Sequence, residues 1–195
     1  ARGHPDDFPQ FSLIEPDYFG YLQNDDHPPH DIMRAQKLIA DVYSALRRNE
    51  ALWKSTLLVV FYDEHGGFYD HVIPPKADSP DDHVAIIPYK DGPREFKFDQ
   101  LGLRVPAILA SPWVKAGVEP TQFDHTSLLR FVIDKWNLRE LDSKRVKNAN
   151  SIAVALREKA ERTDTPRGIT LSPDQLKPID PDLEDSATEK ETEHQ

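Results

Sequence analysis

The chain has 195 residues, of which 34 are acidic and 24 are basic, so its formal charge is −10 with histidine neutral. This balance argues against nucleic acid as a partner, because binding to nucleic acid depends on basic side chains that neutralise phosphates. Cysteine is absent, which excludes disulfide bonds, thiolate metal sites and cysteine nucleophiles. Apolar runs such as residues 57–62 are far shorter than the roughly 20 residues of a membrane-spanning helix, so no transmembrane segment is predicted.

The first half of the chain predicts a helix followed by a strand. Residues 1–30 are rich in proline, aspartate and aromatic side chains and indicate a loop with one short strand at 10–14. Apolar residues then recur three and four positions apart up to Leu46, which predicts a helix with Asp31 as its N-cap. A polar loop at 47–55 leads into residues 56–62, whose continuous apolar and β-branched composition is typical of a strand buried on both faces.

A turn rich in acidic residues and histidine follows this strand directly. Two adjacent glycines give the backbone the freedom for a sharp turn, and around them lie Asp63, Glu64, His65, Asp70 and His71. In α/β proteins, ligands bind at the carboxyl ends of the strands. The sequence therefore predicts an α/β fold with its functional site at this turn.

The second half continues the α/β pattern. Residues 72–100 contain five prolines among charged residues and predict a long surface excursion that could act as a lid. A second buried strand is expected at 104–110. Helices are expected at 124–136, with Asp124 or Thr126 as the cap, and at 151–162.

We divide the chain into one domain and a tail. Residues 1–162 carry all the predicted helices and strands. Residues 163–195 are rich in proline and then acidic, and they contain too little apolar surface to order themselves. The sequence therefore predicts a single α/β domain followed by a disordered tail.

The adjacent carboxylates of Asp63 and Glu64 leave two interpretations open. They repel each other unless a cation, a proton or a basic side chain offsets their charge, and a divalent metal ion is the simplest offset. Carboxylate and imidazole groups suit zinc, iron, manganese, magnesium or calcium, so the metal is unidentified, and further ligands would have to come from elsewhere. The alternative is a solvated turn whose histidines only form hydrogen bonds.

Several other polar residues have ordinary structural explanations. Residues 124–127, Asp-His-Thr-Ser, suggest a serine hydrolase dyad, but their place before a predicted helix favours capping. Arg104 could bind phosphate, although a pair with one of the many carboxylates is favoured. On residue chemistry alone, His27 and His30 are exposed loop residues, and the basic run at 144–147 is a solvated face.

The most specific motif is residues 56–75, TLLVVFYDEHGGFYDHVIPP. It closely resembles the hallmark segment of the phosphoesterase family that contains bacterial and plant non-specific phospholipases C and a related acid phosphatase. Shorter motifs extend the resemblance over residues 8–136, namely SLIEP at 12–16, DHPP at 26–29, GLRVPAILASPW at 102–113 and DHTSLLRF at 124–131. It implies a three-layer α/β/α fold like that of alkaline phosphatase, with a metal-assisted site at the carboxyl ends of the strands.

The resemblance also implies roles for individual residues. Asp63 and Glu64 would be metal ligands, and His27 would project toward the substrate phosphate. His71 would be a second catalytic histidine or, with His65, would orient the ligands. The cation would stabilise charge on the phosphoryl oxygens, and imidazole would donate a proton. The implied partner is a phosphate ester, either a phospholipid or a soluble ester.

Two further implications concern what the chain lacks. Complete family members carry an upstream Glu-Asn metal motif and a threonine or serine nucleophile, and neither is present here. We therefore expect the incomplete C-terminal portion of a catalytic domain, which needs the upstream half of the same protein and by itself hydrolyses esters poorly. The alternatives are a non-catalytic fragment that binds a cation or a partner, and a sulfatase or phosphomutase of the same architecture. Exported and cytoplasmic locations both fit.

Overall fold

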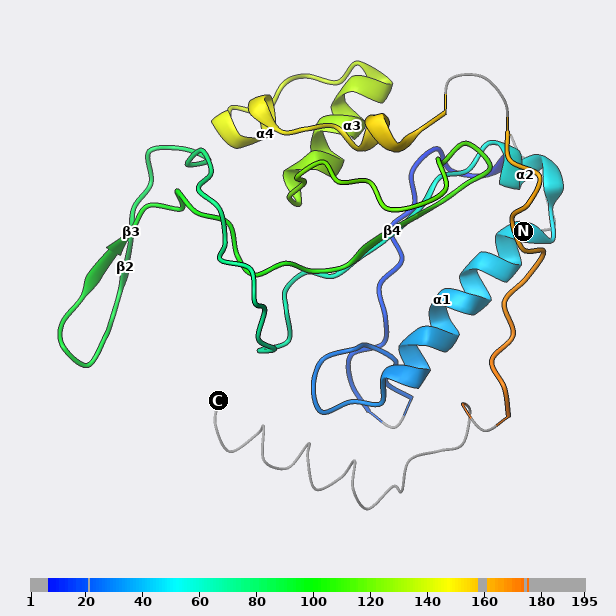
Figure 1. The fold of residues 1–195 in the computed structure, drawn as a ribbon, viewed down its shortest axis with the longest axis horizontal. Helices are drawn as coiled ribbons and strands as arrows, with labels where there is room; N and C mark the ends of the chain where they lie inside the picture. Colours follow the sequence, from blue (N-terminus) through cyan, green and yellow to red (C-terminus); the bar gives the residue numbers. More distant parts are fainter. Residues whose placement is uncertain (1–6, 21, 158–160, 174, 176–195) are drawn as a thin grey trace. The chain divides into compact units, whose positions relative to one another are not determined.

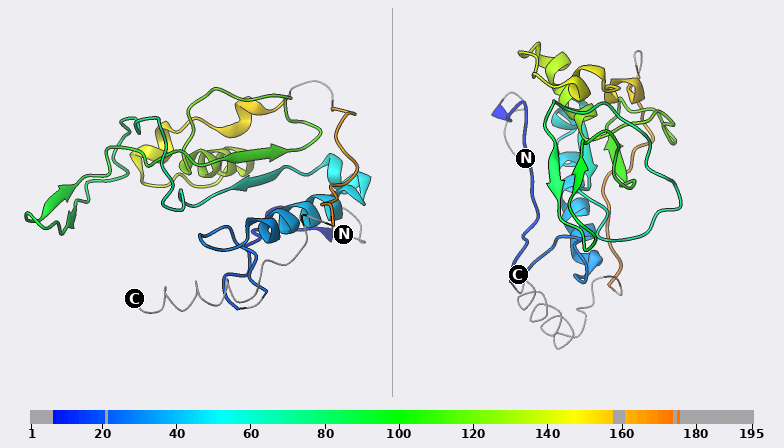
Figure 2. Two further views of the ribbon diagram at one scale, coloured as in Figure 1. Left: turned by 60° about the horizontal axis from the view of Figure 1, so that its bottom comes forward. Right: turned by 90° about the vertical axis from the view of Figure 1, so that its left-hand side faces the viewer.

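The computed structural model describes residues 7–20, 22–157, 161–173 and 175 (Figure 1). The described elements are α1 (Ile32–Arg47), α2 (Glu50–Lys54), β1 (Leu58–Phe61), β2 (Ala85–Ile87), β3 (Arg94–Phe96), β4 (Ala107–Ala110), α3 (Thr126–Trp136), α4 (Lys144–Asn148) and the 3-10 turn η2 (Ile152–Ala155). β1 pairs with β4, and β2 pairs with β3 in an antiparallel hairpin (Figures 1 and 2). This mixture of helices and small sheets confirms the predicted α/β class.

The chain forms two compact units, which we describe separately. The first comprises the described parts of residues 1–60, 109–112 and 161–195, and the second comprises those of residues 61–108 and 113–160. None of the described helices has the length and apolar character that crossing a membrane requires. The predicted boundary at residue 162 stays a prediction, and residues 174 and 176–195 of the predicted tail lie outside the described residues.

The first unit is built on α1, which begins where the sequence predicts. The Asp31 carboxylate caps it by accepting a hydrogen bond from the backbone nitrogen of Met33 at 3.0 Å. The predicted loop at 47–55 is wrong, because it contains α2. Asn49 caps α2 by accepting a bond from the nitrogen of Leu52 at 3.1 Å. Periodicity did not reveal this helix, since five residues are too few to show an apolar stripe.

The core of the first unit lies between these two helices. Its buried members are Tyr43, Leu46, Leu52 and Trp53, and partly buried Val42, Leu58 and Ala110 pack against them. The Trp53 side chain is almost fully buried, meets the ring of Tyr43 edge-on at 5.3 Å, and lies 5.1 Å below the guanidinium of Arg47. Aromatic and cation–π packing of this kind adds to the free energy of burying the rings.

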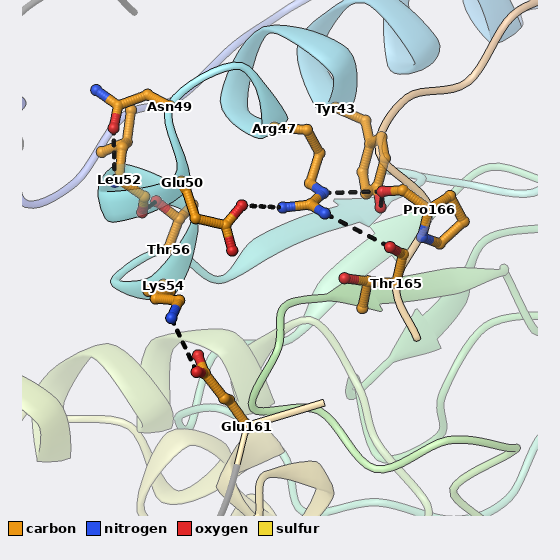
Figure 3. A network of polar contacts seen from close by, with 10 residues as sticks. All are labelled: Tyr43, Arg47, Asn49, Glu50, Leu52, Lys54, Thr56, Glu161, Thr165 and Pro166. Carbon is orange, nitrogen blue, oxygen red and sulfur yellow. Dashed lines mark hydrogen bonds and ion pairs between the residues drawn. The ribbon is translucent and has the colours of Figure 1, made fainter. Parts of the chain in front are cut away.

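The segment from Glu161 to Ile169 is fastened to the same helices by hydrogen bonds (Figure 3). Tyr43 donates from its hydroxyl to the Pro166 carbonyl at 2.6 Å, and Arg47 donates from Nε to that carbonyl at 2.8 Å. Lys54 pairs with Glu161 at 2.9 Å, and this carboxylate raises the pKa of Lys54. The backbone of a proline-rich segment is thus held by side chains of α1 and α2.

The second unit organises residues 72–100 around the exposed hairpin. The register pairs Ala85 with Phe96, Ile86 with Glu95 and Ile87 with Arg94. The basic run at 144–147 forms α4 and is not simply a solvated face. Arg145 donates from Nε to the Asp78 carbonyl at 2.8 Å and also donates to the Phe98 carbonyl, so it ties both ends of the excursion to α4.

Three further predictions about secondary structure are wrong. Residues 10–14 form no strand. β1 and β4 are half-buried to exposed instead of buried on both faces, because within the described residues each pairs only with the other. Of the helix predicted at 151–162, the described residues 151–157 form only the 3-10 turn η2, and residues 158–160 lie outside the described residues. The turn ends where Lys115 donates to the Ala155 carbonyl at 2.9 Å and Leu156 pairs with Val114, so strand-like pairing replaces the helical bonds.

Replacing Trp53 with Ala should cost about 3–5 kcal/mol of unfolding free energy, because the variant leaves a cavity at the centre of the first unit. Urea unfolding followed by circular dichroism measures this loss. Phe19→Ala is the control, since the Phe19 side chain is 86% exposed and its removal should change stability by less than about 0.5 kcal/mol. Equal losses in the two variants would contradict the placement of the core.

Candidate functional site

The acidic turn follows the end of β1 in the second unit. Its backbone takes the positive φ angles that the sequence predicts, 62° at Gly66 and 73° at Gly67. The Asp63 carboxylate accepts the backbone N–H of Glu64 at 2.9 Å, and the Glu64 carboxylate accepts that of Gly66 at 2.7 Å. Both side chains are exposed. The turn is therefore held by its own carboxylates, which stay open to solvent.

The charge of this acidic pair is not offset by a basic side chain in the parts of the chain that the structure describes. No ion pair joins Asp63 or Glu64 to a described lysine or arginine. Within the same residues, no group of three or more histidine, aspartate or glutamate side chains is arranged to hold a metal ion. The two carboxylates could thus supply two hard oxygen ligands to a divalent cation, and its remaining ligands would have to come from elsewhere.

Asp70 forms a bidentate ion pair with Arg104. Its carboxylate accepts from Arg104 Nε at 2.7 Å and from Arg104 Nη2 at 2.8 Å, and also from the backbone nitrogen of Val72 at 3.1 Å. The hydrogen bonds from Arg104 hold the pKa of Asp70 far below its usual range and raise the pKa of Arg104, although burial opposes both shifts. This confirms that Arg104 pairs with a carboxylate.

The bidentate pair joins the turn after β1 to the segment that leads into β4. Asp70 is only 12% exposed, whereas the neighbouring His71 is 80% exposed with Nδ1 3.5 Å from Asp70 Oδ1. His71 therefore lies on a solvent-facing part of an anchored loop. Sequence reasoning gave Asp70 no role of its own, because its partner lies 34 residues away and no local pattern connects the two.

His27 lies in the first unit, on the loop before α1. Its side chain is exposed, as residue chemistry predicts. The prediction for His30 is wrong, because its side chain is only 11% exposed and contacts both carboxylate oxygens of buried Asp25 at 2.8 and 2.9 Å. The structure thus places His27 on one unit and Asp63, Glu64 and His71 on one loop of the other.

The Asp-His-Thr-Ser segment lies at the start of α3, and its side chains bond to backbone groups instead of forming a hydrolase dyad. Asp124 accepts the backbone N–H of Thr126 at 2.7 Å, and the Ser127 hydroxyl accepts the backbone N–H of Asp124 at 3.1 Å. The ring of His125 contacts the Tyr62 carbonyl through Nε2 at 2.7 Å. The N-cap residue of α3 is His125, whose side chain forms no capping hydrogen bond, so the prediction of Asp124 or Thr126 as the cap is wrong. The segment still links the start of α3 to the residue before the acidic turn.

Comparison with known proteins identifies the family. A model of the Phosphoesterase family matches residues 4–139. Non-specific phospholipase C3 of Arabidopsis thaliana is 41% identical over 172 residues, which are 81% of this chain and 32% of that protein. Non-specific phospholipase C6 of the same plant is 43% identical over 142 residues, or 67% of this chain and 26% of that protein.

Bacterial relatives are similar over a shorter stretch. The non-hemolytic phospholipase C of Burkholderia pseudomallei is 35% identical over 123 residues, which are 58% of this chain and 17% of that protein. The chain therefore belongs to the Phosphoesterase family. It spans about a third or less of the length of these relatives.

Replacing Asp70 with Asn should destabilise the second unit at neutral pH, because an amide cannot keep both charge-assisted bonds to Arg104. Folding lowers the pKa of Asp70. Its charge therefore contributes fully to the stability of the folded state above the pKa of the unfolded chain, about 3.9, and this contribution is lost as the pH falls through the pKa of the folded state. In urea titrations, the stability gap between wild type and variant should be constant above about pH 5 and shrink below about pH 4.

The matched control is Asp91→Asn in the hairpin. Asp91 pairs with Arg94 at 2.6 Å, but these side chains are 67% and 61% exposed, so solvent screens the pair and the substitution should change stability little at any pH. A gap for Asp70→Asn that stays constant down to about pH 2 would contradict the role given to its charge.

Proposed function

We propose that this chain is part of a metal-dependent phosphoric ester hydrolase. The observation that carries the proposal is the acidic turn after β1, where two adjacent exposed carboxylates have no basic partner among the described residues. Membership of the Phosphoesterase family and similarity to proteins named phospholipase C support hydrolysis of a phosphate ester. The names of these relatives favour a phosphodiester of the phospholipid class over a soluble monoester.

The donor atoms of the turn fit a divalent cation of unidentified type. Asp63 and Glu64 would hold it. Each carboxylate accepts one backbone hydrogen bond within the turn, and both side chains are exposed to solvent. A bound cation would stabilise negative charge on the phosphoryl oxygens. In this proposal, His27 and His71 are the catalytic residues that exchange protons with the substrate and the attacking group.

The proposed fold is the C-terminal portion of a three-layer α/β/α domain like that of alkaline phosphatase. In that arrangement β1 and β4 belong to the central sheet, and the acidic turn lies at its carboxyl-terminal edge. The upstream part of the domain would supply the nucleophile and the remaining metal ligands. Support comes from the length of the relatives, of which this chain spans about a third or less.

A chimera provides the test. Residues of this chain replace the matched region of Non-specific phospholipase C3, so that the relative supplies the rest of the domain. Asp63→Ala or Glu64→Ala should lower the rate of phospholipid hydrolysis by about 100-fold or more, because losing a ligand removes several kcal/mol of charge stabilisation. The measurement is head-group release from phosphatidylcholine vesicles, with a phosphomonoester and a sulfate ester as comparison substrates.

The control for this experiment is Asp82→Ala, which also removes one of two adjacent exposed acidic residues and should leave the rate unchanged. The Asp82 side chain is 99% exposed and lies 3.5 Å from the ammonium of Lys144. Full activity of Asp63→Ala or Glu64→Ala would refute the metal-ligand assignment. Faster turnover of the sulfate ester would instead assign the chain to a sulfatase.

A further inference from the structure

The ring of His125 connects the start of α3 to the end of β1. Its Nε2 lies 2.7 Å from the backbone carbonyl of Tyr62, and the ring meets that of Phe61 edge-on with the centroids 5.8 Å apart. His125 and Tyr62 are 63 positions apart in the sequence, and both belong to the second unit. The contact therefore joins two distant segments of one unit at the residue that precedes the acidic turn.

The backbone on either side of His125 is held by its neighbours. His125 occupies the N-cap position of α3, but its side chain forms no capping hydrogen bond. Asp124 instead accepts the backbone N–H of Thr126 at 2.7 Å, and the hydroxyl of Ser127, a residue only 2% exposed, accepts the N–H of Asp124 at 3.1 Å. The start of the helix thus does not use the imidazole of His125, which contacts the carbonyl of Tyr62.

The contact with Tyr62 is a hydrogen bond that His125 donates. A carbonyl oxygen only accepts, so a hydrogen is assigned to Nε2. The neutral Nε2–H ring and the protonated ring both carry this hydrogen, so either form can donate the bond. Because a peptide group is planar, the bond restrains the carbonyl of Tyr62 together with the N–H of Asp63, which belongs to the same peptide group. It therefore acts on the backbone directly before the first carboxylate of the acidic turn.

This restraint complements the ion pair on the other side of the acidic turn. Asp70 and Arg104 hold the loop after the turn, whereas His125 holds the peptide group before it. Between these two points, Asp63 and Glu64 are exposed and bond only to backbone groups of the turn. Adjacent carboxylates repel each other, so a cation that both of them bind requires a backbone that keeps them together.

We propose that His125 is a positioning residue, which fixes the peptide group before Asp63 and so directs the carboxylates of Asp63 and Glu64 toward one divalent cation. The inference rests on the proposed function in so far as these two residues are the metal ligands. Groups that orient metal ligands without touching the metal commonly raise metal affinity. His65 contacts the Phe68 carbonyl at 2.9 Å within the turn, so it does not tie the turn to another element as His125 does.

Nuclear magnetic resonance of the metal-free chain tests the inference. His125→Phe keeps an aromatic ring beside Phe61 but cannot donate, so the carbonyl carbon of Tyr62 should move upfield and the amides of Asp63 and Glu64 should shift. His125→Gln places an amide N–H at a reach similar to that of Nε2 and should return these signals toward those of the wild type. If the Gln variant is as perturbed as the Phe variant, the donor is not what positions the turn, and the inference is overturned.

The matched control is His83→Phe, the same replacement at another exposed histidine of the second unit. The His83 ring stacks on Phe98 with the centroids 6.4 Å apart, and within the described residues it has no hydrogen bond or ring contact with the acidic turn. Its replacement should therefore leave the signals of the turn unchanged.

His125→Ala is a second variant that removes the donor, with less bulk than phenylalanine. Wild-type signals for Tyr62 and Asp63 in whichever of the Phe and Ala variants keeps the circular dichroism of the wild type would overturn the inference.

Binding of Mn²⁺ adds a readout on the ligands themselves. In titrations followed by broadening of the Glu64 and Gly66 amides, His125→Phe should weaken the affinity by about 3- to 10-fold, which corresponds to the loss of one hydrogen bond. His125→Gln and His83→Phe should keep the wild-type affinity. Unchanged affinity in His125→Phe overturns the inference. If Mn²⁺ does not bind at the turn of the wild type while the metal-free signals respond as expected, the proposed metal site fails and the positioning of the turn by His125 is retained.

Discussion

The ion pair between Asp70 and Arg104 is the constraint on which the candidate site depends. Two hydrogen bonds of 2.7 and 2.8 Å close the loop that begins after β1 against the segment that enters β4. Asp63 and Glu64 lie on this loop, and their mutual repulsion would otherwise favour an open conformation. The guanidinium of Arg104 donates to both carboxylate oxygens of Asp70, whose side chain is only 12% exposed. The pair therefore fixes the orientation of the two side chains as well as the distance between them.

The two units use the same arrangement for their exposed polar groups. In the second unit, a mostly buried aspartate anchors a loop whose acidic pair and histidine face solvent. In the first unit, Asp25 anchors the loop of His27, while the hydrogen bonds of Tyr43 and Arg47 fasten the Glu161–Ile169 segment to α1 (Figure 3). These side chains can thus stay accessible on loops that are held in place, since the charge that holds each loop is largely removed from water and matched by donors.

The sequence predicted those features that depend on local chemistry. Periodicity and one capping aspartate were enough for α1, and adjacent glycines were enough for the turn. Predictions failed where distant partners decide the outcome. Residues 155–157 lie in a segment of helical composition, but pairing with residues 113–115 competes for their backbone. The sequence predicts an exposed His30, whereas in the structure this side chain is mostly buried against Asp25. The anchors Asp25 and Asp70 could not be identified, because nothing in a local pattern distinguishes them from other carboxylates.

Binding of manganese to this chain tests the central claim most directly. Mn²⁺ broadens the resonances of nearby protons, so a titration monitored by amide spectra reports where the ion binds. We expect the amides of Glu64, Gly66 and Gly67 to broaden first, and Asp63→Asn to abolish that effect. Initial broadening at another adjacent acidic pair, such as Asp81 and Asp82, with no effect at the turn, would contradict a divalent cation held by Asp63 and Glu64.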